Sequence, residues 1–441
     1  MTNEAYPNPI PAERRAEYRY GLYYHKQTAP DGSIYVKPLI VLRNGYGDIV
    51  RFTKLHQFAD ASAGKVFVPI ASSGKERMYH VCAMLNYIII DKYPQFGIDH
   101  IFQIRREALN AFFQSYATDH DGNGNLRNSV TVEKCINNCV DFFRKLKRRF
   151  GEAVAINLDE LYSEQTALGR NGRRIVKRVP LFQVRGVVKR REAFNDLPTK
   201  AFKILLTLAF RYAPDIAFAF CLQAFAGLRA GETLNVRQEN SPLGCGIVFT
   251  RIGSFVRKIE IDLTRELQLR SDGVICGGIK KARLQCVYPP FIQAFTAAYE
   301  QHKSWIEKRN FEKEYFPMFI NSKGLAMTYK DYQYRYQQLV KEYFRPALLQ
   351  SGDDEMQIYG QLLYENNLGL HALRHWFSCQ LALRGESIAQ IQFWRGDSSP
   401  ESALTYLQNK GDLVRELETG SEFLAEILMQ EGAGRIHGNC D

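Results

Sequence analysis

The sequence predicts a mainly α-helical protein with small β elements: a short N-terminal β-module, a helical domain, and a larger mixed α+β domain. The first observation is the alternation of apolar and polar residues over residues 17–56, which is typical of strands. The second is the return of apolar residues every three or four positions over residues 74–150, 291–345 and 368–430, which predicts helices. A chain of 441 residues, 45% apolar and 24% charged, is globular and long enough for two or three domains.

The small β-module occupies residues 1–72. Turn signals at Pro30-Asp31-Gly32 and Asn44-Gly45 separate its predicted strands. The pattern does not decide between an additional binding arm and a packing element.

Residues 73–165 form the helical domain, because three of its segments each place apolar residues on one helical face. The last segment ends in a run of basic side chains, which either complements the negative end of the helix dipole or lies along phosphate groups. These side chains are Arg144, Lys145, Lys147 and Arg148.

A basic linker is predicted at residues 166–196. Its segment 170–191, RNGRRIVKRVPLFQVRGVVKRR, holds nine Lys or Arg residues and no acidic residue. A solvated surface usually mixes both signs of charge, so a segment of one sign favours a strap across a phosphate backbone over a simple linker. The candidate contacts are Arg173, Arg174, Lys177, Arg178, Lys189 and Arg190.

Charge and cysteine content narrow the partners and the compartment. Lys and Arg outnumber Asp and Glu by 58 to 47, a net charge of +11 that suits a polyanion, with nucleic acid ahead of an anionic membrane. The nine cysteines lack CxxC or zinc-ligand spacing, which predicts buried thiols in a reducing compartment and no metal site. We expect no other cofactor. The first residues lack the apolar core of a signal peptide and no stretch approaches a membrane span, so we expect a cytoplasmic protein.

Residues 197–441 form the mixed domain and contain the polar residues best placed for chemistry. The stretch FAGLRAGETLNV sets Arg229 just after a glycine that ends a buried helix. The stretch GGIKKARLQCVYPP is a turn with Lys280 and Lys281 at its tip. The stretch HALRH puts His371 and Arg374 three residues apart, on one face of a helix.

A fourth stretch, WRGDSSPESALTYLQ, ends one helix at Gly396 and carries Tyr406 in the next. Arginine forks neutralise the non-bridging oxygens of a phosphodiester, and a tyrosine oxygen can attack phosphorus in line to form a covalent intermediate. Two arginines, a lysine, a histidine and a tyrosine brought together would therefore suit phosphoryl transfer without a metal.

These stretches together resemble the tyrosine recombinase (phage-type integrase) family over residues 75 to 415. The resemblance implies a core-binding (SAM-like) domain at residues 73–165 and a catalytic domain with a C-terminal tail helix at residues 197–441. It implies a site-specific DNA recombinase or integrase of a mobile element, acting as a dimer to tetramer on double-stranded DNA. The β-module lies outside the resemblance, and the need for accessory DNA-bending proteins stays open.

The resemblance also implies a role for each site residue. Arg229 and Arg374 would clamp the scissile phosphate, and Tyr406 would form a 3′-phosphotyrosine. His371 would assist proton transfer or hydrogen-bond the phosphate. Glu232, three residues after Arg229, matches an acidic position that supports the pocket.

Lys281 would protonate the departing 5′ oxygen. It is preferred to Lys280 because it lies eight residues before Pro289, as the family's lysine lies before a proline that ends a strand.

Asp397 departs from the family, which has His or Trp at this position to donate a hydrogen bond to the phosphate. An ionised carboxylate cannot donate, and it repels a phosphate. Asp397 would turn onto Arg395, be held protonated, or mark a weakened site. Two alternatives therefore stay open: a DNA-binding regulator that keeps the fold with an impaired site, and a type IB topoisomerase-like nicking and closing enzyme.

Overall fold

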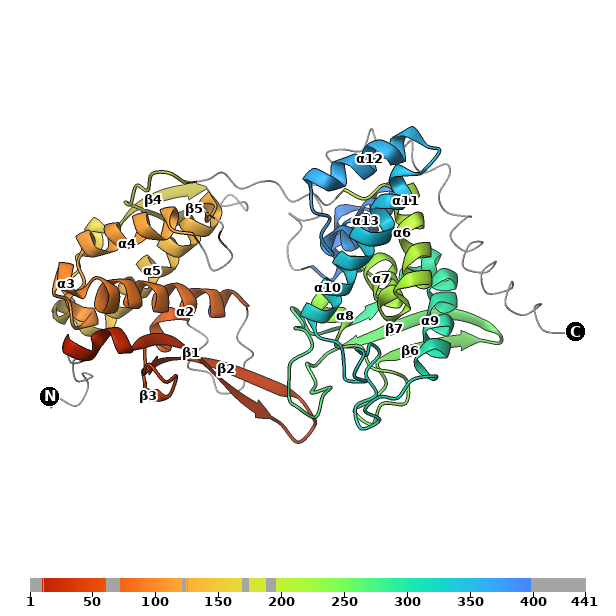
Figure 1. Ribbon diagram of the computed structural model, residues 1–441, viewed down its shortest axis with the longest axis horizontal. Helices are drawn as coiled ribbons and strands as arrows, with labels where there is room; N and C mark the ends of the chain where they lie inside the picture. The colour runs from red at the N-terminus through yellow and green to blue at the C-terminus, as the bar shows by residue number, and fades with distance from the viewer. Residues whose placement is uncertain are drawn as a thin grey trace, which may run out of the picture. The chain divides into compact units, whose positions relative to one another are not determined.

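The structure is a computed structural model that describes residues 10, 12–60, 72–120, 124, 126–168, 174–187 and 196–397. The chain divides into two compact units, which are residues 1–27 with 35–192 (unit 1) and residues 28–34 with 193–441 (unit 2). Helices make up most of the regular structure, and the strands form small antiparallel sheets (Figure 1). The prediction of a mainly α-helical protein with small β elements is confirmed.

Unit 1 combines a three-stranded sheet with a helical bundle. The sheet has the order β1-β2-β3, and β2 and β3 pair antiparallel with Val41 opposite Phe52. Buried side chains from this sheet, such as Ile40 and Leu42, join those of the helices in one core. The β-module and the helical domain, which the sequence separates at residue 72, therefore share a core. The elements are β1 (Arg19–Thr28), β2 (Ile34–Arg43), β3 (Ile49–Phe52), α1 (His56–Ala59), α2 (Ser72–Leu85), a π-helical turn (Asn86–Asp91), α3 (Tyr93–Phe96), α4 (Arg106–Thr118) and α5 (Ser129–Phe150).

Part of the predicted basic linker is a strand. β5 (Arg174–Pro180) pairs antiparallel with β4 (Tyr162–Leu168), from Tyr162 opposite Pro180 to Leu168 opposite Arg174. The order of β5, RIVKRVP, does not alternate between apolar and charged residues, so it gives no period-two signal of a strand.

Unit 2 is built around a helix that is buried on all sides. α7 (Pro214–Ala226) buries every residue from Ile216 to Ala226, as expected for a helix with apolar residues all round. It packs against α6 (Thr199–Tyr212), α9 (Ile292–Ile306) and α13 (His371–Leu383). The core of unit 2 is therefore organised by one sequence segment of extreme hydrophobicity.

A three-stranded antiparallel sheet lies at one end of unit 2, and α12 lies at the other (Figure 1). The strands of this sheet have the order β6-β7-β8, with Ile247 opposite Ile261 and Ile261 opposite Gln285. No helix of the described ranges is both long and apolar enough to cross a bilayer. The remaining elements are α8 (Ala230–Thr233), β6 (Ile247–Ile252), β7 (Phe255–Leu263), β8 (Arg283–Cys286), α10 (Tyr329–Leu339), a π-helical turn (Val340–Phe344), α11 (Arg345–Leu349), α12 (Asp354–Glu365) and α14 (Ile388–Arg395).

Candidate active site

The end of α7 brings two of the predicted site residues together. Gly227 ends the helix in the left-handed conformation, with φ +66°. An added Cβ there would lie 2.6 Å from ring carbons of Phe377 on α13. This close approach of α7 and α13 requires glycine, and it places Arg229, the residue before α8, near Arg374 of α13.

Arg374 is a fully buried cation of unit 2. Its side chain is 1% exposed, and its guanidinium donates to the carbonyls of Gly227 and Arg395, the latter at 2.9 Å. Burial and the nearby cations Arg395 and Arg229 lower its pKa to about 9, although Asp397 opposes the shift. Arg374 therefore stays cationic at neutral pH, and a negatively charged group beside it would be stabilised.

Asp397 supplies that anion. Its Oδ1 accepts from Arg229 Nη2 at 2.5 Å and from Arg374 Nη2 at 2.7 Å. Its Oδ2 lies 2.9 Å from Arg395 Nε, and the side chain is 9% exposed. The carboxylate contacts Arg395 but is not turned away from the predicted phosphate position, because it also lies between the two predicted clamp arginines. We call Arg229, Arg374 and Arg395 the arginine cage.

The backbone around Asp397 explains this placement. α14 ends at Gly396, which takes the left-handed conformation with φ +62°. The N–H of Asp397 then donates to the carbonyl of Gln392 at 3.1 Å, and the Gln392 side chain donates back to the carbonyl of Asp397 at 3.2 Å. The helix end thus directs the carboxylate into the arginine cage.

Glu232 is completely buried beneath the arginine cage. It accepts from the N–H of Arg229 at 3.0 Å, from Arg229 Nη1 at 2.9 Å, and from both Nη atoms of Arg283 at 2.8 and 3.1 Å. Burial alone would raise its pKa, but the hydrogen bonds and charges of Arg283 and Arg229 lower the pKa to about 2. Glu232 therefore holds Arg229 in place as an ionised carboxylate.

Arg283, which was not among the predicted site residues, links this carboxylate to the predicted lysine. Arg283 also donates to the carbonyl of Lys281 at 2.9 Å and to Gln285 at 2.6 Å. Alternation along a strand puts residues 281, 283 and 285 on one side of the chain, and this signal could have identified Arg283.

Lys281 lines a cavity of about 320 Å³ together with Arg283 and Asp397, whereas the neighbouring Lys280, which the structure also describes, does not line it. Both lysine side chains are exposed. The cavity is shared by Asp397, which the arginine cage binds, and by the turn with Lys280 and Lys281 at its tip (the lysine turn), which favours Lys281 as the lysine of the site.

His371 begins α13, one turn before Arg374, and part of its ring reaches solvent. Partial burial and the charges of Arg374, Arg395 and Arg229 lower its pKa to about 4. The imidazole is therefore neutral near pH 7 and can accept a proton. His375 contacts Cys379, with Nδ1 3.4 Å from Sγ, which fits local packing.

Tyr406 lies outside the described residues, as do Arg173, Lys189 and Arg190. Of the other basic side chains, Arg144 and Lys145 pair with Asp141 at 2.5 and 2.7 Å, and Lys147 pairs with Glu152 at 3.1 Å. Arg178 pairs with Glu164 at 2.9 Å. The side chains of Arg148, Arg174 and Lys177 are exposed.

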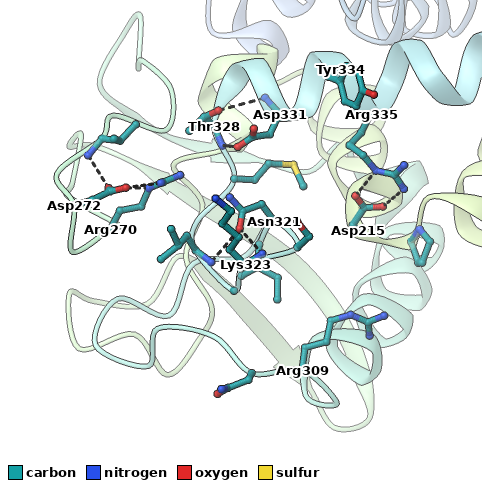
Figure 2. Close-up of a pocket in the computed structure, with 18 of the residues that line it drawn as sticks. Asp215, Arg270, Asp272, Arg309, Asn321, Lys323, Thr328, Asp331, Tyr334 and Arg335 are labelled. Atoms are coloured by element: carbon teal, nitrogen blue, oxygen red, sulfur yellow. Dashed lines mark hydrogen bonds and ion pairs between the residues drawn. The ribbon is translucent and has the colours of Figure 1, made fainter.

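A second cavity of about 1170 Å³ lies elsewhere in unit 2 and contains none of the described site residues (Figure 2). Two of its cations pair with carboxylates, Arg335 with Asp215 at 2.8 Å and Arg270 with Asp272 at 2.5 Å, and Arg309 and Lys323 also line it. The smaller cavity contains both Lys281 and Asp397, so it is the better candidate for the predicted chemistry.

Comparisons with known proteins give structural likenesses at low identity. No protein-family model matches the chain, and no curated protein matches it. A solved structure of the Tn1549 transposon integrase with transposon right end DNA is 14% identical, with a TM-score of 0.46, over 83% of this chain and 98% of that one. A XerH site-specific recombinase bound to its difH substrate is 13% identical, with a TM-score of 0.45, over 78% and 79%. A lambda integrase dimer bound to a core site is 13% identical, with a TM-score of 0.43, over 81% and 95%.

Proposed function

We propose that the chain is a site-specific DNA recombinase that cleaves and rejoins DNA strands through a 3′-phosphotyrosine intermediate on Tyr406. The observation that carries the proposal is the shared contact of Arg229 and Arg374. These residues are far apart in the sequence, yet both donate to one oxygen of Asp397. Two guanidinium groups that converge on one carboxylate oxygen form a site in which a phosphate oxygen fits as well.

The proposed reaction exchanges the Asp397 carboxylate for the scissile phosphate. The Tyr406 oxygen attacks phosphorus while the bond from phosphorus to the 5′ oxygen breaks. Lys281 gives a proton to the departing 5′ oxygen, and neutral His371 accepts the phenolic proton. Rejoining reverses these steps, with a 5′ hydroxyl from a second DNA strand attacking the phosphotyrosine.

The guanidinium groups take the part that a metal plays in other phosphoryl transfers, because they neutralise the charge of the transition state. The phosphotyrosine bond conserves the energy of the cleaved bond, so ATP is not needed. Double-stranded DNA is the proposed partner, with two to four copies of the chain assembled on it. Exposed basic side chains of unit 1, such as Arg148 and Lys177, would contact the phosphate backbone.

A nicked suicide duplex tests the proposal. The substrate carries inverted repeats from the DNA beside the gene, with a nick that releases the cleaved 5′ fragment, and the reaction contains EDTA. We expect a covalent protein–DNA adduct on a denaturing gel. It should be absent for Tyr406→Phe and present for Tyr364→Phe, a matched change at an exposed tyrosine of α12. An adduct that survives Tyr406→Phe would refute the assignment, and relaxation of plasmids that lack the repeats would indicate a topoisomerase instead.

Asp397 favours a second candidate function, a DNA-binding regulator without strand cleavage. Its carboxylate already neutralises the arginine cage, and it cannot donate a hydrogen bond to a phosphate. The regulator would bind specific DNA and form no adduct, either as the natural chain or as Asp397→His. The recombinase would keep or increase adduct formation in Asp397→His.

A further inference from the structure

A turn near the N-terminus is part of unit 2. Residues 28–34, which connect β1 and β2, pair with the segment that follows β7. The N–H of Ile34 donates to the carbonyl of Glu266 at 2.9 Å, and the N–H of Gln268 donates to the carbonyl of Gly32 at 3.2 Å. This pairing adds a short piece of antiparallel structure beside Glu266.

The sequence of the turn is suited to this docking. Asp31 accepts from the N–H of Ser33 at 3.0 Å, and Gly32 has φ +78°. Ser33 and Ile34 are 4% and 5% exposed. Asp31 also pairs with Arg265 at 2.9 Å, at the surface. The turn therefore docks by backbone hydrogen bonds and by burial, with an exposed ion pair at its edge.

The side chain of Glu266 in turn contacts the backbone of the lysine turn. Its Oε1 accepts from the N–H of Ile279 at 2.5 Å, two residues before Lys281. On the other side of Lys281, Arg283 donates to the Lys281 carbonyl at 2.9 Å. The backbone that carries Lys281 is thus held from both sides, by Glu266 and by Arg283.

The start of the lysine turn is held as well. Asn235 donates to the carbonyls of Gly231 and Gly277 at 3.0 and 2.8 Å. An added Cβ at Gly277 would clash with the carbonyl of Gly231, so the two backbones are in direct contact. Gly231 belongs to α8, which Arg229 precedes, so the position of the lysine turn is defined relative to the arginine cage.

We infer that Glu266 and the turn 28–34 are positioning elements for Lys281, so that this turn, which docks within unit 2, acts in catalysis through the lysine. The inference rests on the proposed function, because it concerns the proton that Lys281 gives to the 5′ oxygen. Glu266 contacts the backbone of the lysine turn and orders it, and Lys281 alone meets the reacting atoms. This gives the segment before residue 72 a function that the family resemblance does not cover.

The test compares two suicide substrates that differ in one atom. In the first, the leaving group is the natural 5′ oxygen, which needs a proton. In the second, sulfur replaces that bridging oxygen, and because a thiolate is a far weaker base it leaves without a proton. Single-turnover adduct formation is measured for the full chain and for Glu266→Ala, Glu266→Gln, Asp31→Ala and Lys281→Ala. Glu365→Ala, a change of an exposed glutamate of α12, is the control.

General acid catalysis contributes on the order of 10²–10⁴ in rate, so Lys281→Ala should lose about that factor with the oxygen substrate. Glu266→Ala should lose about tenfold or more, Asp31→Ala less, and both should approach the rate of the natural chain with the sulfur substrate. Glu266→Gln keeps an acceptor oxygen for Ile279 and should recover much of the loss. Glu266→Ala combined with Lys281→Ala should be no slower than Lys281→Ala alone.

Equal losses on both substrates would overturn the inference, because a general structural defect slows both reactions. Unchanged rates on both substrates in Glu266→Ala and Asp31→Ala would overturn it too. Asp31→Ala removes the exposed ion pair with Arg265 and the contact with the N–H of Ser33 but keeps Glu266, so it serves if Glu266→Ala fails to fold. The absence of an adduct from the natural chain on either substrate would instead count against the proposed function, and the inference would fall with it.

Discussion

Replacing Asp397 by Asn tests whether the carboxylate holds the place of a phosphate. The two side chains have the same shape, so the change removes charge and little else. The carboxylate meets three guanidinium groups at 2.5, 2.7 and 2.9 Å and is 9% exposed. Removing one partner of a buried ion pair costs about 3–5 kcal/mol. Because Asn keeps one acceptor oxygen, we expect a loss near the lower value, about 3 kcal/mol, which lowers the melting temperature of a unit this size by roughly 6–12 °C.

Added phosphate should stabilise the Asp397→Asn variant against unfolding more than it stabilises the natural chain. In the natural chain, a free anion competes with a carboxylate that is tethered at the same position. In Asp397→Asn the tethered side chain is neutral and competes less, so an anion at a hundred times its dissociation constant would restore about 2.7 kcal/mol. The weaker competition should also raise the rate of adduct formation, by about tenfold for each 1.4 kcal/mol of competition removed.

Thermal unfolding in graded phosphate measures both effects. The matched control is Asp262→Asn, which breaks another ion pair of unit 2, from Arg237 Nη2 to Asp262 Oδ2 at 2.6 Å, with the arginine 1% exposed. It should lose stability without gaining a response to phosphate. The reasoning would be refuted if Asp397→Asn had the same melting temperature as the natural chain, or if phosphate stabilised it no more than it stabilises Asp262→Asn.

The other predictions concern Lys281 and Glu232. Lys281→Ala should slow adduct formation by on the order of 10²-fold or more and Lys280→Ala by only a few fold, because Lys281 lines the cavity beside Asp397; equal effects in the same gel assay would contradict this. The pKa of Glu232 is lowered to about 2, so its ionised form adds about 3 kcal/mol of stability above pH 4.5, and this is lost as the pH falls through 2. Glu232→Gln should be less stable at neutral pH and should show a flatter decline in acid-unfolding curves; a decline as steep as that of the natural chain would contradict it.

The helices could be predicted from the sequence because most of them bury one face, and burial requires the spacing that the sequence shows. α7 is the clearest case, since apolar residues all round predicted its central place. β5 was not predicted because its basic residues, such as Lys177 and Arg178, favoured a strap across a phosphate backbone, and its residues do not alternate. The shared core of the β-module and the bundle was also missed, because contacts between Ile40 and helices far along the chain leave no local pattern.

The candidate site divides in the same way. Arg229 and Arg374 could be identified from short motifs, because each motif combines a helix boundary or face with a specific side chain. Arg283 and Glu266 act through partners distant in the sequence or on backbone atoms, and a motif does not record such contacts. The orientation of Asp397 could not be predicted for the same reason, because it depends on contacts with Arg229 and Arg374, which are distant in the sequence.

The arginine cage explains why a carboxylate at position 397 is compatible with the proposed chemistry. Without an anion, the cage would bury Arg374 and Arg395 beside Arg229, and mutual repulsion would oppose folding. Even with Asp397 present, the pKa of Arg374 falls to about 9. Asp397 therefore stabilises the protein without DNA, and a bound phosphate would take over the same role. The arginine cage binds one anion both without DNA and with DNA. Because a phosphate must displace Asp397, this carboxylate lowers the affinity for DNA, but the number of anions in the cage stays the same.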